Sequence, residues 1–293
     1  MNNKKFSYKA FVHLFFVLYG FICIIPFLLI VSISLSNETD IINKGFNLIP
    51  AHFSGDAYSQ IFQNPKALIG AYGVTLLNAV AGTALAIIMQ AMLGYELSRD
   101  TCVFKKPINI MLIITMFFSG GLIPSYVVNT QVFHLGDTIW IYILSGCMSA
   151  YNVFVFRTFF STIPKSLIES AQLDGATEMQ MLAKITVPLS KPVLATFTFT
   201  GMLARWNDYT IPMYYITDDR LYNLQYLLQQ ILNEAAFLKQ LQDSMPQLAS
   251  AVAIPSETLK FAMCVLAAGP MVLVFPFFQK YFAKGMVVGA VKG

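Results

Sequence analysis

The residues of this sequence that could do chemistry are polar and charged side chains set inside long apolar runs. Such groups are costly in lipid, and they occur there mostly along substrate paths or in hydrogen bonds between helices. The candidates are Asn78, Tyr151, Asn152, Arg205, Trp206, Asn207, Asp208 and Tyr209. We therefore predict that these residues contribute to a path for a polar substrate.

Each candidate also has a purely structural interpretation. Asn78 and Asn152 can join neighbouring helices by hydrogen bonds. Arg205 and Asp208 are three residues apart, so they share a helical face and can form an ion pair. The aromatic residues beside them suit the belt at the outer membrane interface. The sequence leaves both interpretations open.

Catalytic and metal-binding constellations are not apparent. The three histidines, His13, His52 and His134, lie far apart in the sequence. The four cysteines are Cys23, Cys102, Cys147 and Cys264, and no two have C-x-x-C spacing. We therefore predict no catalytic residue, no metal ligand and no disulfide framework.

The composition is that of a membrane protein. Of 293 residues, 56% are hydrophobic and only 12% are charged, and the mean hydropathy is +0.62. An average soluble domain is roughly 45–50% apolar and about 25% charged. Disorder is excluded, since it requires low hydrophobicity and high net charge. The formal net charge of +4 does not indicate nucleic acid here, because the basic residues are distributed according to the sides of a membrane.

Six apolar segments are long enough to span a bilayer, and lipid requires them to be helical. They lie at about 11–35, 69–97, 108–132, 138–161, 192–216 and 259–282. The first is too long for a signal peptide, so we expect an uncleaved anchor. The predicted fold is an all-α polytopic membrane protein with six transmembrane helices, in a single domain over residues 1–293.

The basic residues fix the orientation of these spans. With the N-terminus in the cytoplasm, 13 of the 19 Lys and Arg residues fall in inside segments and 5 in outside segments, and Arg205 lies within a span. Positive charge concentrates on the cytoplasmic side of membrane proteins. We therefore predict that both termini are cytoplasmic.

The cytoplasmic loop 162–191 carries signals for two short helices. Pro164 ends the preceding helix, and Ser166 with Glu169 predicts a capping box at the start of a new one. Gly175 after Asp174 can adopt the left-handed conformation that ends this helix. The predicted helix is too short to be stable alone, so it must dock either on this chain or on a cytoplasmic partner.

The second helix has its own signals. Thr177 and Gln180 predict a capping box at its start, and Pro188 marks its end. Pro192 fits the first turn of the next span. We expect a helical hairpin that lies beneath the membrane.

This hairpin resembles the EAA motif of the membrane subunits of binding-protein-dependent ABC importers. That motif reads Glu-Ala-Ala, three residues, Gly, nine residues, Ile, one residue, Leu-Pro. The matching residues are Glu169, Ala171, Gly175, Ile185 and Pro188. Ser170 and Val187 depart from the pattern by small changes. The chain also resembles carbohydrate importers of the maltose-transporter type at 156–160, 206–209 and 279–293. Within that type it most resembles subunits for oligosaccharides and polysaccharide fragments such as alginate.

The resemblance implies a type I ABC importer permease fold and a carbohydrate that crosses the cytoplasmic membrane of a bacterium by alternating access. It implies that a separate ATPase is coupled through Glu169, Ser170, Ala171, Asp174, Gly175, Ile185 and Pro188. Glu169 would pair with a basic group of the ATPase, and the C-terminal tail would reach toward the ATPase dimer. No G-x-x-x-x-G-K-[ST] motif occurs, so ATP and Mg²⁺ would be bound by that partner.

The resemblance further implies a full set of partners. These are a second permease subunit in a heterodimer, two ATPase subunits, an extracytoplasmic solute-binding protein, the carbohydrate and membrane lipid. An outer amphipathic helix is predicted within 217–258, from Leu221, Leu224, Leu228, Ile231 and Ala235. The alternatives are a membrane-embedded glycosyl or lipid transferase, which would need a convergent acid–base or metal set, and a scaffold that does not transport.

Overall fold

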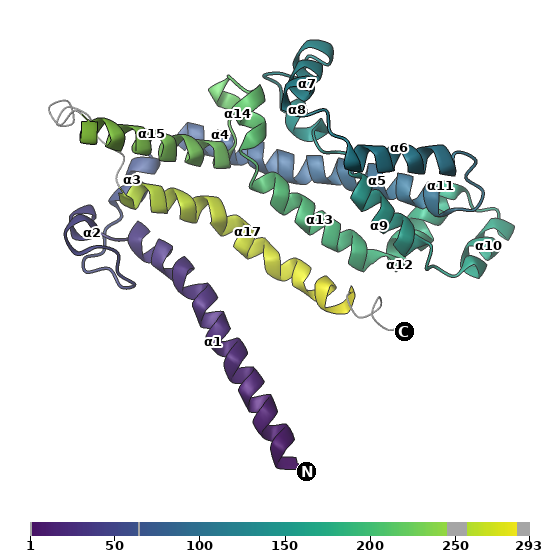
Figure 1. Cartoon of the computed structure of the whole chain (residues 1–293), viewed down its shortest axis with the longest axis horizontal. Coiled ribbons are helices and arrows are strands. Elements are labelled where there is room, and N and C mark those ends of the chain that lie inside the picture. Colours follow the sequence, from purple (N-terminus) through teal and green to yellow (C-terminus); the bar gives the residue numbers. More distant parts are fainter. Residues whose placement is uncertain (1, 64, 245–256, 286–293) are drawn as a thin grey trace. The chain divides into compact units, whose positions relative to one another are not determined.

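The computed structural model of the chain describes residues 2–63, 65–244 and 257–285, and these fold into helices joined by short loops (Figure 1). The predicted C-terminal tail and the end of the outer segment 217–258 lie partly outside these ranges. The chain divides into two compact units. The first unit contains residues 1–68 and 227–270, and the second contains residues 69–226 and 271–293.

The first unit is built from the N-terminal helices and parts of three later ones. Its elements are α1 (Asn2–Ser34), α2 (Glu38–Lys44), α3 (Asp56–Ile61), the start of α4 (Pro65–Leu77), most of α15 (Leu224–Ser244) and the first half of α17 (Glu257–Gly285). Helix α15 confirms that a helix forms within 217–258, although Leu221 lies before it, in a short 3₁₀ turn.

The second unit holds the remaining elements. Before the hairpin they are η1 (Asn78–Gly82), α5 (Thr83–Ser98), α6 (Lys105–Phe117), α7 (Leu122–Val127), η2 (Val128–Val132), α8 (Ile139–Leu144) and α9 (Ala150–Phe160). The hairpin and the elements after it are α10 (Lys165–Leu173), α11 (Glu178–Met181), η3 (Leu182–Thr186), α12 (Val187–Leu189), α13 (Lys191–Trp206), α14 (Thr210–Tyr215) and η4 (Asp219–Leu221).

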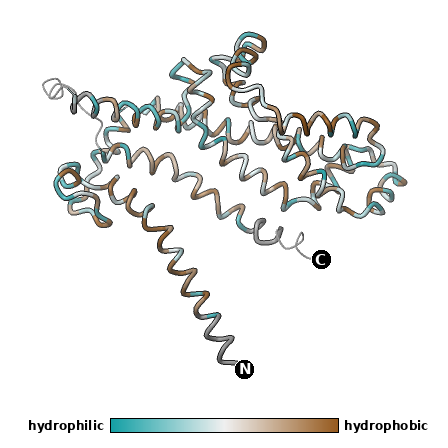
Figure 2. The backbone as a smooth tube through the Cα atoms, viewed as in Figure 1, coloured by the Kyte–Doolittle hydropathy of each residue, from teal (hydrophilic) through white to brown (hydrophobic). Residues whose placement is uncertain are grey.

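Three described helices are long and apolar enough to cross a membrane. They are Phe11–Ser34, Pro65–Ser98 and Glu257–Gln279, and they match the predicted spans 11–35, 69–97 and 259–282. The first of these helices is exposed. Its most apolar stretch has no residue buried within the chain, and Figure 2 colours most of α1 brown. Such a surface must be covered by lipid or by another protein.

The other three predicted spans are interrupted, so the count of six is not confirmed. Segment 108–132 bends by 118° between Lys105–Phe117 and Leu122–Val132, next to Gly121 at φ +86°. Segment 138–161 breaks between α8 and α9, where Gly146 has φ +69°. Segment 192–216 breaks after Trp206. The described helices give three spans, or four if the bent pair counts as one.

A carboxylate holds the start of α17 in the first unit. Glu38 Oε1 accepts a hydrogen bond from the backbone N–H of Glu257 at 2.8 Å. Its Oε2 accepts from the backbone N–H and the hydroxyl of Thr258, at 3.0 and 2.7 Å. A negative group is favourable there, because the first N–H groups of a helix have no partner within it.

The core of the second unit depends on a close approach between α5 and α9. A Cβ atom added to Gly94 would lie 2.7 Å from Phe156 Cβ and 3.1 Å from the carbonyl oxygen of Val153. Real Cβ atoms do not come so close, so only glycine lets these helices touch here. Phe156 and Phe160 belong to one hydrophobic core cluster, and their ring centroids are 5.8 Å apart.

We expect Gly94→Ala to lower the free energy of unfolding by about 1–3 kcal/mol, because α5 and α9 must separate. Gly73→Ala is the matched control, since its added Cβ meets nothing within 4 Å and alanine favours a helix. The measurement is unfolding of both variants in detergent micelles. Equal stability of the two would contradict the close approach.

Candidate functional site

The first limb of the hairpin, α10, ends where its sequence predicts and begins two residues earlier than a capping box at Ser166 implies. The helix starts at Lys165 with Pro164 as its N-cap, so Ser166 lies inside the first turn and the predicted capping box with Glu169 is wrong. Pro164 has extended backbone and supplies the fixed φ that starts the helix. At the other end Gly175 has φ +77°.

The turn after α10 is a Schellman motif. The N–H of Ala176 donates to the carbonyl of Ala171 at 2.9 Å, and the N–H of Gly175 donates to the carbonyl of Gln172 at 3.0 Å. These two bonds satisfy carbonyls that the end of a helix leaves free. The predicted turn at Asp174 and Gly175 is confirmed.

The second limb begins with the predicted capping box. The N–H of Gln180 donates to Thr177 Oγ1, and Gln180 Oε1 accepts from the N–H of Thr177. The limb continues through η3 and ends at Leu189, one residue after Pro188. The wide turns of η3 come just before this proline, which has no N–H to donate. Pro192 lies in the first turn of α13, as predicted.

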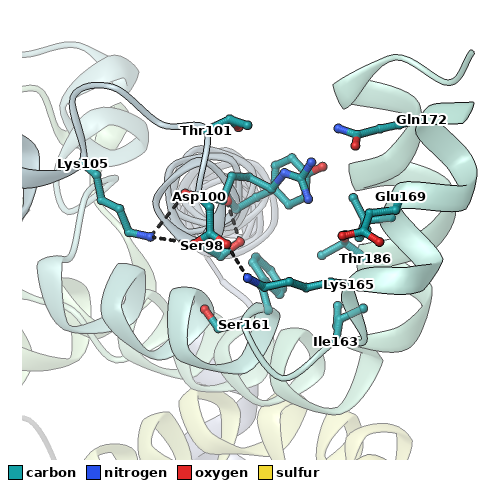
Figure 3. A pocket seen from close by; sticks show the side chains of 14 residues that line it. Ser98, Asp100, Thr101, Lys105, Ser161, Ile163, Lys165, Glu169, Gln172 and Thr186 are labelled. Carbon is teal, nitrogen blue, oxygen red and sulfur yellow. Dashed lines mark hydrogen bonds and ion pairs between the residues drawn. The ribbon is translucent and has the colours of Figure 1, made fainter.

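A cavity of about 280 Å³ lies between α10 and the end of α5 (Figure 3). Glu169, Gln172 and Thr186 lie on one side of it, and Ser98, Asp100 and Thr101 lie on the other. The hydroxyl oxygen of Thr186 is buried and has no hydrogen-bond partner among the described residues. The cavity walls carry charge of both signs.

Two sets of charge contacts join the hairpin to the end of α5. Tyr95 donates its hydroxyl hydrogen to Glu178 Oε2 at 2.7 Å, and Arg99 Nη2 lies 3.5 Å from Glu178 Oε1. Lys165 pairs with Asp100, and Lys105 Nζ lies 3.9 Å from the same carboxylate. Each limb of the hairpin thus has its own contact with α5 or the loop after it.

The Asp100–Lys165 pair sets the pH dependence of this contact. Lys165 lowers the pKa of Asp100, and Asp100 raises the pKa of Lys165. The stabilisation from Asp100 is present at neutral pH and is lost as the pH falls through its lowered pKa. The stabilisation from Lys165 is present below its unfolded pKa and is lost as the pH rises through its raised folded pKa.

We expect Lys165→Gln to lower the melting temperature slightly at pH 7 in low salt. The loss should disappear in acid and in about 1 M salt, where the Debye length is about 3 Å. Thermal unfolding across pH and salt measures it, with Lys184→Gln as the control on the same hairpin. A loss that persists in high salt would show that the lysine acts through packing.

The hairpin leaves its predicted coupling residues accessible. Ile168 is the buried residue of α10 and holds the helix on the unit. Glu169, Ser170, Asp174, Gly175 and Pro188 are exposed, and Ala171 and Ile185 are half-buried. Apolar side chains are exposed beside them, and Leu173 is 90% exposed. An exposed apolar patch of this kind fits a binding surface for another protein.

Arg205 is the centre of a second polar cluster. Its Nη1 donates to Asn78 Oδ1 at 2.9 Å and to the carbonyl of Tyr142 at 2.6 Å, and its Nη2 donates to the carbonyl of Ser145 at 2.9 Å. These carbonyls belong to the end of α8, so the guanidinium caps a helix C-terminus. A Cβ atom on Gly82 would come within 2.8 Å of Arg205 Cζ. An added side chain at Gly82 would therefore force the guanidinium to move from this position.

The predicted ion pair between Arg205 and Asp208 is not found among the described residues. Asp208 Oδ1 instead accepts from the backbone N–H of Thr210 at 2.9 Å and from its hydroxyl. This turn lies between α13 and α14. Asp208 therefore stabilises the break in the predicted span 192–216, and Arg205 binds the break in 138–161.

A cavity of about 420 Å³ lies beside this cluster. Four of its lining residues are Gln90, Asn152, Arg205 and Asp208. Gln90 Nε2 donates to the carbonyl of Cys147 at 2.9 Å, and Asn152 Nδ2 donates to Gln90 Oε1 at 3.0 Å. Amide groups and a guanidinium can bind hydroxyl and carboxylate groups of a polar ligand.

The structure separates the other predicted path residues from this cavity. Trp206 is buried, with its ring centroid 6.4 Å from that of Tyr72. Asn207 Nδ2 donates to the carbonyl of Leu203, and Asn207 Oδ1 accepts from Gln225. Tyr151 and Tyr209 are exposed, and neither is among the residues that line the cavity. Asn78 is fully buried and reaches the cavity only through Arg205.

Gln90 is a residue of the cavity that sequence reasoning missed. It is a buried amide inside the apolar run 69–97, and the criterion that selects Asn78 also applies to it. Its two partners come from the break 145–149 and from α9. Both are more than fifty residues away, so the sequence does not show that the amide is needed.

The fold and these two sites define a class of protein. It is a helical, multi-pass membrane protein with broken spans around a polar cavity and an exposed hairpin beside them. Residues 101–288 match the family described as "Binding-protein-dependent transport system inner membrane component". The chain belongs to this family and is a permease subunit.

Similar proteins in Bacillus subtilis (strain 168) are also permeases. The chain is 34% identical over 296 residues to the polygalacturonan/rhamnogalacturonan transport system permease protein YtcP, and the alignment covers 100% of both chains. It is 26% identical over 301 residues to the arabinooligosaccharides transport system permease protein AraQ, covering 100% of this chain and 99% of that protein.

A solved structure has the same fold. It is a crystal structure of a bacterial ABC transporter involved in the import of the acidic polysaccharide alginate, with a TM-score of 0.80 and 25% sequence identity. The match covers 96% of this chain and 99% of that one. These comparisons confirm the resemblance and the all-α permease fold, and they give no support to a membrane-embedded transferase.

Proposed function

We propose that this chain is one transmembrane subunit of an ATP-driven ABC importer that moves a carbohydrate across the bacterial cytoplasmic membrane. Family membership supports an importer, and the two named relatives and the structural neighbour all serve carbohydrates. The observation that carries the proposal is the exposed hairpin α10–α11, with Glu169 and Gly175 at the spacing of the coupling motif.

A separate ATPase docks on this hairpin and holds the ATP and Mg²⁺. Leu173 and Met179 are exposed apolar side chains on the two limbs, and the exposed Glu169 on the first limb lines the 280 Å³ cavity. Apolar contacts around one charge fit a cleft that contains a basic residue. Closure of two ATPases would then move the hairpin and switch the access of the membrane cavity from one side to the other.

The assembly contains more than these two chains. A second permease subunit covers the exposed apolar helices, two ATPases bind beneath, and an extracytoplasmic binding protein delivers the carbohydrate to the outer segments. Both termini of this chain would be cytoplasmic, which the distribution of Lys and Arg favours. The chain itself is not catalytic.

The substrate class is an oligosaccharide or polysaccharide fragment with acidic groups. Polygalacturonan and alginate, named for two similar proteins, are both acidic. The 420 Å³ cavity offers Gln90 and Asn152 for hydroxyl groups, and Arg205 adds positive charge to its wall. The remaining predicted path residues, Tyr151, Trp206, Asn207 and Tyr209, are available only to a path outside this cavity.

The test is uptake in proteoliposomes that contain this subunit, its partner permease and the ATPases, with the binding protein added outside. ATP inside should drive accumulation of uronate oligosaccharides, and Glu169→Gln should reduce it. Glu96→Gln, an exposed acid on α5, is the control for loss of charge. Absence of ATP-dependent uptake for acidic and neutral oligosaccharides alike would overturn the proposal.

A further inference from the structure

One continuous helix, α5, lies between the hairpin and the polar cavity, and the hydroxyl of a buried tyrosine makes the contact between the second limb of the hairpin and that helix. Tyr95 on α5 is only 5% exposed, and its hydroxyl donates to Glu178 at 2.7 Å. Arg99, the residue directly after α5, approaches the other oxygen of the same carboxylate at 3.5 Å. Arg99 Cζ also lies 5.8 Å from the centre of the Tyr95 ring, so the three groups form one compact set.

Glu178 is fixed from its own side as well. It is the first residue of α11, directly after Thr177, and the capping box of Thr177 and Gln180 fixes the backbone around it. Its carboxylate lies at the N-terminus of α11, where negative charge is favourable. The second limb of the hairpin therefore cannot move without pulling on Tyr95 or breaking this bond.

The contact of the first limb is of a different kind. The side chains of Asp100 and Lys165 are 70% and 78% exposed, whereas those of Arg99 and Glu178 are 16% and 53% exposed. Exposed ion pairs are weak and are screened by salt. A force on the hairpin would pass mainly through the part-buried Tyr95–Glu178 bond, which is anchored on the buried Tyr95, and less through the exposed pair.

Helix α5 carries this contact to the cavity. A helix rises about 1.5 Å per residue, so Gln90 lies about 7.5 Å along the axis from Tyr95, and Thr83 lies about 18 Å from it. Both residues line the 420 Å³ cavity. Gly94, next to Tyr95, locks α5 against α9, which carries Asn152 on the same cavity wall.

We infer that Glu178 and Tyr95 are positioning residues that transmit the movement of the coupling hairpin to α5, and through α5 to the wall of the polar cavity. This inference rests on the proposed function. It assigns the transmission step to a bond within this chain, distinct from the contact between Glu169 and the ATPase.

The experiment measures carbohydrate uptake per ATP hydrolysed in the complete complex. Tyr95→Phe keeps the buried ring and removes only the hydroxyl, and Glu178→Gln keeps the shape and removes the charge. Each should lower the ratio about fivefold or more, the lower end of typical coupling between sites, while the ATPases stay bound. Tyr19→Phe, at an exposed position of α1, is the matched control and should leave the ratio unchanged.

The double variant Tyr95→Phe with Glu178→Gln separates transmission from general damage. If both residues act through one bond, the double variant should lose no more than either single variant. Additive losses, or an unchanged ratio in the single variants, would overturn the inference. If the unmodified complex shows no ATP-dependent uptake, the proposed function fails instead, so the two failures are distinguishable.

Discussion

Arg205→Met is expected to lower the free energy of unfolding of this subunit by about 3 kcal/mol or more. The guanidinium donates to Asn78 Oδ1 and to the carbonyls of Tyr142 and Ser145. Methionine fills much of the space and donates nothing. Each buried acceptor left without a donor costs about 1–3 kcal/mol.

The same substitution should also disturb the cavity, because Arg205 joins three elements, η1, the end of α8 and α13. Lysine at this position keeps the charge but cannot present the planar fork that binds two carbonyls and an amide at once. Arg205→Lys is therefore expected to recover only part of the lost stability.

Arg220→Met is the matched control. Its side chain is 84% exposed and pairs locally with Asp218 in the turn η4, so little stability should be lost. Unfolding of the purified subunit in detergent micelles compares the three variants. If Arg205→Met were as stable as Arg220→Met, the arginine would not hold the broken helices, and a role in direct substrate contact would become the better explanation.

The hairpin was predictable because its signals are local. Pro164, Gly175 and the pair Thr177–Gln180 each act on backbone groups within five residues, so the order of the residues contains the needed information. The wrong capping box at Ser166 shifts the start of a helix by two positions. That shift changes the cap and leaves the hairpin intact.

The breaks in the spans were not predictable in the same way. Hydropathy treats 138–161 and 192–216 as continuous, yet Arg205 makes an interruption possible by binding carbonyls sixty residues away. Non-helical backbone at membrane depth is tolerated only where protein or water satisfies its polar groups. The sequence places one arginine in an apolar run, and the acceptors that require it are visible only after folding.

The transmission contact has the same origin. Tyr95 and Glu178 are 83 residues apart, and each has an ordinary local interpretation, as a core aromatic and as the first residue of a short helix. Their bond depends on how α5 packs against η3, which places Leu182 in the same cluster as Tyr95. Long-range packing of this kind leaves no periodic pattern and no motif in the sequence.

Gly175→Val should remove most of the bound ATPase from the purified complex. Gly175 has φ +77°, and an added Cβ would meet nothing within 4 Å, so the cost lies entirely in the backbone. A β-branched residue in this left-handed conformation costs about 1–3 kcal/mol. The Schellman bonds of Ala176 and Gly175 would be strained, and α10 would no longer end where the second limb begins.

A docking helix that adopts its bound shape less often binds more weakly by the same factor, which is about 5–150-fold for 1–3 kcal/mol. Gly175→Asn should retain more of the ATPase, because asparagine tolerates this conformation. Gly45→Val is the matched control, with φ +74° and no atom near its added Cβ at the end of α2. Its backbone cost is at least as large, because φ +74° with ψ −167° is a conformation that essentially only glycine adopts, but its position is far from the hairpin in the sequence. Equal loss of ATPase from both valine variants would show that general instability, and not the shape of the hairpin, governs attachment.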